Sequence, residues 1–306
     1  MDKKKMAIIL NAAAGTQETE PLFQQIKEIC REFSMDVTFF LVHSGADIQQ
    51  ITKKVLGKEY AVMVAAGGDG TISAVAKELT GTSAILGIIP LGTRNHFAKD
   101  IQTPLDLREA IYVLSHGEVM TIDTASVNDQ FFINNSSIGL YPKIVKHRDI
   151  FQKDGFYKWF ALIWAFLLVV SKNSFLNIHI VSSEKGIDYK TPIFFIGNNR
   201  YSMQGYELGS RESLTRGKLF LSLMCRTSRL RLLRIIAQAI LGSPPKYADF
   251  DIWESQEVIV YSENKFLQVA LDGEIVPLQA PLRYLIHPRS LHVIVSQKYA
   301  HNHSHR

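Results

Sequence analysis

The stretch that decides the fold is residues 60–71, which read Tyr60-Ala61-Val62-Met63-Val64-Ala65-Ala66-Gly67-Gly68-Asp69-Gly70-Thr71. The residues before the glycines are apolar without alternation, which is typical of a strand covered by helices on both faces. Apolar residues at helical spacing follow the glycines, from Ile72 to Leu79. A buried strand, a glycine turn and a helix in this order predict one strand–helix unit of a parallel sheet.

Strand and helix alternate in the same way throughout residues 5–116. Helical periodicity separates short apolar runs, which predict three further strands at 6–10, 36–42 and 84–90. Such alternation requires right-handed crossovers between parallel strands, with ligands bound at the carboxyl ends of the strands. The loops expected to bind a ligand are therefore 11–15, 67–70 and 91–95.

Beyond about residue 120 the chain changes to short strand-like segments, interrupted by helical stretches only near 156–171 and 229–241. The expected strands are Val119–Val127, Phe131–Ser137, Asn177–Ser182, Pro192–Asn198, Lys218–Cys225, Glu257–Ser262, Phe266–Leu271, Leu282–Ile286 and Leu291–Ser296. We therefore expect an α/β fold with two domains. A Rossmann-like parallel-sheet domain would occupy residues 1–120, and a mostly antiparallel β-sandwich domain residues 121–298. The last strands are candidates to return to the first domain, and residues 299–306 are expected to form a flexible tail.

The composition is that of an ordinary folded protein: 306 residues, 46% hydrophobic and 21% charged, with a formal net charge of +5. This excludes a disordered chain, a collagen-like repeat and a small domain stapled by disulfides. The modest charge and the lack of a recognised motif give no indication of nucleic-acid binding. Cys30 and Cys225 lie far apart in the sequence and are expected to be reduced, packed thiols.

The sequence shows no evident targeting segment. The apolar run that follows the basic start, Met6–Leu10, is shorter than the roughly 7 to 15 residues of an export signal. The longest apolar run, Trp159–Val170, is shorter than the roughly 20 residues needed to span a bilayer. We therefore expect a cytoplasmic protein.

The glycine loop Gly67-Gly68-Asp69-Gly70-Thr71 has the features of a phosphate site. Its glycines let backbone N–H groups approach an anion closely, and the helix N-terminus adds partial positive charge. A carboxylate there would repel bare phosphate, so Asp69 fits if Mg²⁺ lies between them or if Asp69 accepts a proton. The alternative is a tight turn with Asp69 as a helix cap, and the loop alone does not decide between the two.

A second polar loop follows the next strand, in the segment Pro90-Leu91-Gly92-Thr93-Arg94-Asn95-His96-Phe97-Ala98. Thr93 and Asn95 could donate hydrogen bonds to a nucleotide, and two such loops on neighbouring strands support each other. The chain contains neither a GxxxxGK[ST] sequence nor a complete GxGxxG fingerprint. An ordinary P-loop NTPase or Rossmann oxidoreductase is therefore disfavoured.

Five segments in this order resemble the diacylglycerol-kinase-like lipid kinase family: Asn11…Gly15, Gly67–Thr71, Pro90–Ala98, Phe132–Leu140 and Leu271–Glu274. The GGDGT sequence alone is shared with NAD kinases and phosphofructokinases, whereas the later segments are more specific. The resemblance implies an ATP- and Mg²⁺-dependent kinase that phosphorylates the hydroxyl of diacylglycerol or a related membrane lipid. It further implies that the α/β domain binds ATP and that the lipid hydroxyl enters the cleft between the two domains.

The resemblance also implies roles for individual residues. Asp69 would act in catalysis with Mg²⁺, Asp123 would support the magnesium network, and Glu274 would be the catalytic base. From sequence alone, Asp272-Gly273-Glu274 is a hairpin turn with solvated acids. The residues expected to contact ATP are Asn11, Ala12, Ala13, Ala14, Gly15, Gly67, Gly68, Asp69, Gly70, Thr71, Ile72, Ser73, Thr93 and Asn95.

Two positions depart from the family pattern. Arg216 stands where several members carry an aspartate that binds a second, structural Mg²⁺. We expect this site to be absent, or its charge to be replaced by Arg216, because a cation cannot ligate Mg²⁺. His96 stands where many members have an aspartate, which could alter substrate choice or pH dependence.

Two other functions stay open. An NAD kinase would share the GGDGT loop, although Asn135 follows Asn134 where NAD kinases have a glutamate. A nucleotide- or lipid-binding regulator without turnover would fit the two departures from the pattern. A mere binder, however, has no need of the three carboxylates that this chain retains.

A lipid kinase must meet its substrate at a membrane. The segment Arg226–Ile236 places arginines beside aliphatic residues in a predicted helix, as in helices that contact anionic headgroups. Packing of this helix on the second domain is the alternative. The expected partners are a membrane lipid substrate and, through peripheral contact, the inner face of the membrane. The sequence leaves a homodimer open.

Overall fold

The computed structural model describes residues 5–12, 19–140, 142, 175–182, 186–202, 211–224, 228–240 and 249–303. The chain divides into two compact units. Unit 1 is made of Met1–Thr124, Ser213–Arg216 and His287–Arg306, and unit 2 of Ala125–Glu212 and Gly217–Ile286. The helix expected near 156–171, the residues Ala13 to Gly15 and Cys225 lie outside the described residues.

Unit 1 is built on the expected parallel sheet, which has the strand order β2-β1-β3-β4. The end of β16 joins this sheet in parallel beside β4. The four strands are β1 (Met6–Asn11), β2 (Val37–Val42), β3 (Val62–Gly67) and β4 (Ile85–Pro90). The connecting helices are α1 (Thr19–Glu32), α2 (Gly45–Val55), α3 (Asp69–Leu79), α4 (His96–Asp100) and α5 (Leu107–His116).

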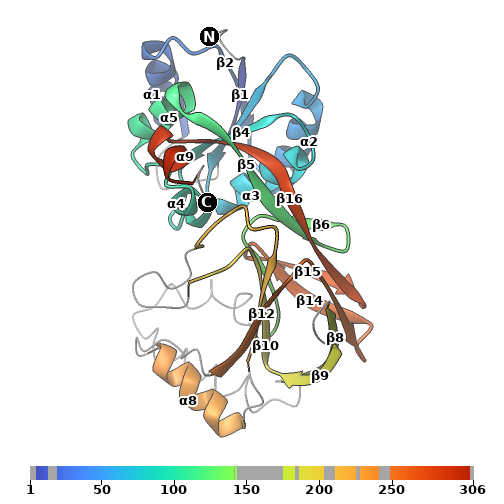
Figure 1. Ribbon diagram of the computed structural model, residues 1–306. Coiled ribbons are helices and arrows are strands. Elements are labelled where there is room, and N and C mark those ends of the chain that lie inside the picture. The colour runs from blue at the N-terminus through green and yellow to red at the C-terminus, as the bar shows by residue number, and fades with distance from the viewer. Residues whose placement is uncertain are drawn as a thin grey trace. The chain divides into compact units, whose positions relative to one another are not determined.

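Both faces of this sheet are covered by helices, as the unbroken apolar strands require. Figure 1 shows α1 and α5 on one side of the sheet and α2 with α3 on the other. Side chains of α1 and α5 share a core with β1 and β3, from Leu22 and Ile111 to Ile8 and Val64. Local polar signals begin the helices: Ser44 accepts a hydrogen bond from the Asp47 backbone N–H at the start of α2.

Unit 2 is the expected antiparallel β-sandwich. One sheet continues from β16 in the order β16-β13-β8-β9, and β5 pairs with β16 and β6; the other sheet has the order β12-β11-β10-β7-β14-β15. The strands of the first sheet are β5 (Glu118–Val127), β6 (Gln130–Phe132), β8 (Leu176–Ser182), β9 (Gly186–Thr191), β13 (Glu257–Ser262) and β16 (Leu282–Val295). Those of the second are β7 (Asn135–Gly139), β10 (Ile193–Asn198), β11 (Leu219–Met224), β12 (Phe250–Ser255), β14 (Phe266–Leu271) and β15 (Glu274–Gln279).

Buried side chains from both sheets form one hydrophobic core in unit 2, which includes Phe132, Ile178, Phe194 and Tyr284. Tyr284 is fully buried, and its hydroxyl lies 3.2 Å from the Ser136 hydroxyl, so the polar atom is paired. Helix α8 (Arg229–Ile240) buries Leu232 and Ile235 in a smaller apolar cluster. The expected basic helix therefore has a packing face within unit 2.

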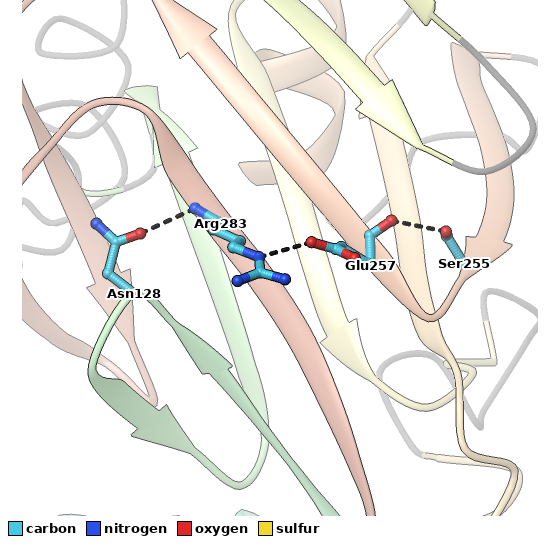
Figure 2. Close-up of polar contacts among 4 residues, drawn as sticks. All are labelled: Asn128, Ser255, Glu257 and Arg283. Atoms are coloured by element: carbon cyan, nitrogen blue, oxygen red, sulfur yellow. Dashed lines mark hydrogen bonds and ion pairs between the residues drawn. The ribbon is translucent and has the colours of Figure 1, made fainter.

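A polar network fixes the β5–β6 turn to β16, as Figure 2 shows. The Asn128 side-chain oxygen accepts a hydrogen bond from the Arg283 backbone N–H at 2.9 Å, and the Asn128 N–H donates to the Arg283 carbonyl at 2.9 Å. The Arg283 side chain donates in turn to Glu257 on β13 at 2.6 Å. Asn128 has a positive φ of 51°, a region that asparagine tolerates better than most residues. Asn128 thus extends the sheet beyond the strand end.

Three expectations about the elements are corrected. The single strand expected at Phe131–Ser137 is two strands, β6 and β7, which belong to different sheets. The two strands expected at Leu282–Ile286 and Leu291–Ser296 are one strand, β16. The tail expected from residue 299 is helical up to His303, in α9 (Gln297–His303), because the buried Tyr299 side chain holds this segment against the protein.

Among the helices in the described ranges, none is long and apolar enough to cross a membrane.

The Cys30 thiol is buried on α1, and burial raises its pKa from 9.0 to about 11. Because the thiolate is the reactive species, this rise lowers the reactive fraction about 100-fold at pH 8. We expect a Cys225→Ser variant to react with dithiobis(nitrobenzoate) at least about 100-fold more slowly when folded than in urea. Rapid labelling of the folded variant would contradict the buried position of Cys30.

Candidate active site

The first loop of the candidate site joins β3 to α3. Gly67 lies against Thr71, since a Cβ atom added at Gly67 would stand 2.4 Å from the Thr71 hydroxyl oxygen. Gly68 is the N-cap residue of α3, and no side chain caps this helix end. Backbone N–H groups in the first turn of a helix have no partner within the helix. Together with the helix dipole, they make this turn suitable for an anion.

The second loop follows β4 and touches the first. A Cβ added at Gly92 would stand 2.6 Å from the Gly68 Cα, so only glycine allows the two backbones to approach this closely. The Leu91 N–H also donates to the Gly67 carbonyl at 2.9 Å. The two loops predicted to bind a ligand therefore meet, glycine against glycine, at the carboxyl ends of neighbouring strands.

Asn95 fixes the shape of the second loop. It is buried, has a positive φ of 50°, and its side chain accepts from the Gly92 N–H at 3.0 Å and donates to the Gly92 carbonyl at 2.6 Å. The sequence suggested a direct hydrogen bond from Asn95 to a nucleotide, whereas the structure shows the side chain bonded within its own loop. Thr93 and His96 beside it are exposed.

Asp69 connects the two loops. It is the first residue of α3, and its carboxylate accepts a hydrogen bond from the Phe97 N–H of α4 at 3.3 Å. The residue is half-buried, so the carboxylate can reach solvent. The side chain thus braces the start of α4, and the role of Asp69 toward a cation stays a prediction.

The end of β1 adds Asn11 to this group. Its side-chain amide donates to the Thr71 hydroxyl at 2.9 Å, which joins the β1 loop to α3. The Ala12 N–H donates to the Val42 carbonyl at the end of β2. Gly70 is exposed and Ser73 is half-buried, while Ile72 is fully buried and its N–H donates to Gly68. The Ile72 side chain therefore packs in the core instead of lining the loop.

Asp123 has a clear structural environment on β5. It is 1% exposed, and its carboxylate accepts from the Arg289 N–H at 2.9 Å. Arg289 has a positive φ of 49°, so this bond holds an unusual turn of the backbone within β16. The Asp123 N–H donates to the Leu214 carbonyl at 2.8 Å, which ties the segment Ser213–Arg216 into unit 1. The Arg216 side chain is exposed.

The donor set suits Mg²⁺ bound together with phosphate. Within the described ranges no three His, Cys, Asp or Glu side chains gather as a metal cage. Mg²⁺ commonly uses one or two carboxylates plus substrate phosphates and water, so Asp69 beside the glycine loops fits that pattern. The glycine contact between Gly68 and Gly92 likewise fits phosphate, because a side chain there would fill the space.

Glu274 lies in unit 2, at the start of β15. The β14–β15 hairpin turns through Asp272 and Gly273, with positive φ values of 49° and 93°, as in a type I′ turn. The Glu274 side chain is exposed and makes no hydrogen bond or ion pair in the described part of the chain. The predicted hairpin turn is confirmed, and Glu274 is solvated as expected. The expectation that Asp272 is also solvated is wrong, because its half-buried carboxylate accepts backbone hydrogen bonds.

Asp272 is the residue whose role the sequence did not suggest. Its carboxylate accepts three backbone hydrogen bonds, from Ile133 at 2.9 Å, Asn134 at 2.8 Å and Asn135 at 3.1 Å. Arg211 donates to the Ile133 carbonyl at 2.6 Å and to the Asn134 side chain at 3.1 Å. The sequence gives one signal for this contact: its two sides lie in Phe132–Leu140 and Leu271–Glu274, two of the segments that resemble the lipid kinase family.

Comparison with known proteins finds a family model that matches the first part of the chain. The sequence model of the diacylglycerol kinase catalytic domain matches residues 5–127. This part of the chain is therefore similar to that catalytic domain. The match contains the glycine loops, Asp69 and Asp123, whereas Glu274 lies outside it.

The chain is also similar in sequence to proteins described as lipid kinases. The chain is 34% identical over 147 residues to "Probable lipid kinase YegS-like" of Pseudomonas aeruginosa, a match that covers 47% of each chain. The chain thus spans about half the length of this relative. It is 22% identical over 275 residues to "Diacylglycerol kinase" of Staphylococcus carnosus, which covers 89% of each chain.

Solved structures share the fold. A crystal structure described as a diacylglycerol kinase from Bacillus anthracis str. Sterne has a TM-score of 0.72 and 17% sequence identity. The likeness covers 98% of this chain and 99% of that one. The chain therefore shares the fold of that structure over nearly its whole length.

Proposed function

We propose that this chain is an ATP- and Mg²⁺-dependent lipid kinase. It transfers the γ-phosphoryl group of ATP to the hydroxyl of diacylglycerol or a related membrane lipid. One observation carries the proposal: within the family domain, two glycine loops touch through Gly68 and Gly92, and Asp69 bridges them. This arrangement offers backbone N–H groups to phosphate and a carboxylate to a cation in one place.

Each part of the site has a physical task in phosphoryl transfer. The transfer depends mainly on positioning and on charge neutralisation. The N-terminal turn of α3 and the Gly92 loop would bind the phosphates, and Asn11 would hold Thr71 in place. Bound Mg²⁺ would neutralise phosphate charge, with Asp69 as its protein ligand. Asp123 would act indirectly, by fixing the backbone at Arg289.

Glu274 is proposed as the base. A carboxylate that accepts the proton of the attacking hydroxyl must come within hydrogen-bond reach of it and keep an oxygen atom available. The exposed Glu274 side chain supports this role, because its carboxylate oxygens make no hydrogen bond in the described residues. We further propose that the protein works in the cytoplasm, in peripheral contact with the inner membrane face where its lipid substrate lies.

A lipid-panel transfer assay tests this function. Purified protein is incubated with labelled ATP, Mg²⁺ and mixed micelles that each contain one lipid alcohol, and the Glu274→Gln variant controls for contaminating kinases. We expect a phospholipid product with diacylglycerol or a related lipid. A parallel reaction contains NAD in place of the lipid, and product formed only from NAD would instead identify an NAD kinase. Stabilisation by ATP against thermal unfolding, without transfer to any lipid, would identify a regulator.

A further inference from the structure

The β6–β7 connection is the place where the chain leaves one sheet of the sandwich and enters the other. Ile133 and Asn134 form this connection, and both are buried. Buried backbone groups outside a strand ladder need other partners, because an unpaired one costs about 1–3 kcal/mol. The N–H groups at this crossing therefore need hydrogen-bond acceptors from the surrounding residues.

The Asp272 carboxylate is the acceptor for these N–H groups. It accepts the N–H groups of Ile133, Asn134 and Asn135 at 2.9, 2.8 and 3.1 Å. The Asp272 N–H donates back to the Asn135 carbonyl at 2.9 Å. Four hydrogen bonds thus join one residue of the β14–β15 turn to three consecutive residues of the crossing.

The carbonyl groups of the crossing are held by other residues. The Ile133 carbonyl accepts from Arg211 and from Asn198, at 2.6 and 2.9 Å. The Asn134 carbonyl accepts from the Tyr201 hydroxyl at 3.0 Å. Since the crossing is fixed from this side as well, it is a rigid support for whatever binds to it.

We propose that Asp272 is a positioning residue for Glu274. The turn that carries Glu274 has only two residues, and Asp272 anchors it to the crossing. Glu274 itself has an exposed side chain with no hydrogen-bond partner in the described residues, so its placement depends on its backbone. The carboxylate of Asp272 therefore sets where the Glu274 carboxylate stands. This inference rests on the proposed function, because it gives Glu274 its role.

The test compares Asp272→Asn with the wild type, with Glu274→Gln and with the double variant. Asparagine tolerates the positive φ but replaces one acceptor oxygen by a donor. We expect kcat for lipid phosphorylation to fall at least about tenfold in Asp272→Asn, with the KM for ATP unchanged. In the Glu274→Gln background the same change should lower kcat less than twofold, because the group that it positions is already gone.

Amide hydrogen exchange supplies a readout that does not depend on activity. Exchange at residues 133–135 should accelerate in Asp272→Asn and stay unchanged in Glu274→Gln. Asp272→Gly is the second variant, because glycine keeps the turn conformation without a carboxylate. Asp129→Asn, which changes an exposed aspartate in the β5–β6 turn, is the matched control and should leave kcat and exchange unchanged.

Two results would overturn the positioning role in an enzyme whose wild type is active. One is an equal loss of kcat from Asp272→Asn in the presence and absence of the Glu274 carboxylate. The other is unchanged exchange at residues 133–135 in both Asp272 variants. A wild-type protein that phosphorylates no lipid would refute the proposed function itself, so the two failures are distinguishable.

Discussion

Replacing Glu274 by glutamine is expected to lower kcat for lipid phosphorylation about 10²- to 10⁴-fold, the usual contribution of a general base. Glutamine keeps the size of the side chain but cannot accept the proton of the attacking hydroxyl. Because the Glu274 side chain is exposed and makes no polar contact in the described residues, the fold should be unaffected. The measurement is a steady-state transfer assay with micellar diacylglycerol.

ATP binding separates this effect from general damage. The stabilisation of Glu274→Gln by ATP in thermal unfolding should equal that of the wild type, because the glycine loops are in the other unit. Glu263→Gln, another exposed glutamate in unit 2, is the matched control and should retain full turnover. If Glu274→Gln has the same kcat as the wild type, Glu274 is not the catalytic base.

Replacing Gly92 by alanine is expected to weaken ATP binding about tenfold or more. The new Cβ would stand 2.6 Å from the Gly68 Cα and 2.8 Å from the Asn95 side-chain oxygen. Backbone atoms on one side and a buried, hydrogen-bonded side chain on the other cannot move away easily, and overpacking of this kind costs about 1–3 kcal/mol. The two loops must separate, so the phosphate site loses its shape.

Isothermal titration with ATP and Mg²⁺ measures this loss, and circular dichroism checks that the variant is folded. Gly45→Ala is the matched control, since a Cβ at Gly45, the first residue of α2, meets nothing within 4 Å. It should bind ATP like the wild type. An unchanged ATP affinity in Gly92→Ala would show that the contact between the loops does not shape the nucleotide site.

The parallel sheet of unit 1 was readable from the sequence because its strands are buried on both faces. A strand such as β3 contains only apolar residues and ends at glycine, so its pattern is unmistakable. The strands that the sequence did not reveal are β9, β12 and β15, and each lies at the edge of a sheet. Edge strands are partly exposed and tolerate residues such as Pro277 in β15, so they lack a strong apolar pattern.

The candidate site was predictable as far as local sequence determines it. The order of strand, glycine turn and helix placed the loops at Gly68 and Gly92 on neighbouring strands, and the structure brings them together. The role of Asp272 could not be predicted, because its hydrogen bonds join residues separated by more than 130 positions. The break between β6 and β7 could not be predicted for the same reason, since the residues of the break are hydrogen-bonded to the distant Asp272 carboxylate.

The way the chain builds unit 1 affects its synthesis. The last strand beside β4 and the turn held by Asp123 come from residues after His287, whereas the glycine loops are made within the first hundred residues. On a ribosome the glycine loops therefore emerge long before the strand that borders their sheet. The nascent chain must carry an open β4 edge until all of unit 2 has been translated, and deleting residues 287–306 would leave that edge uncovered in the folded chain.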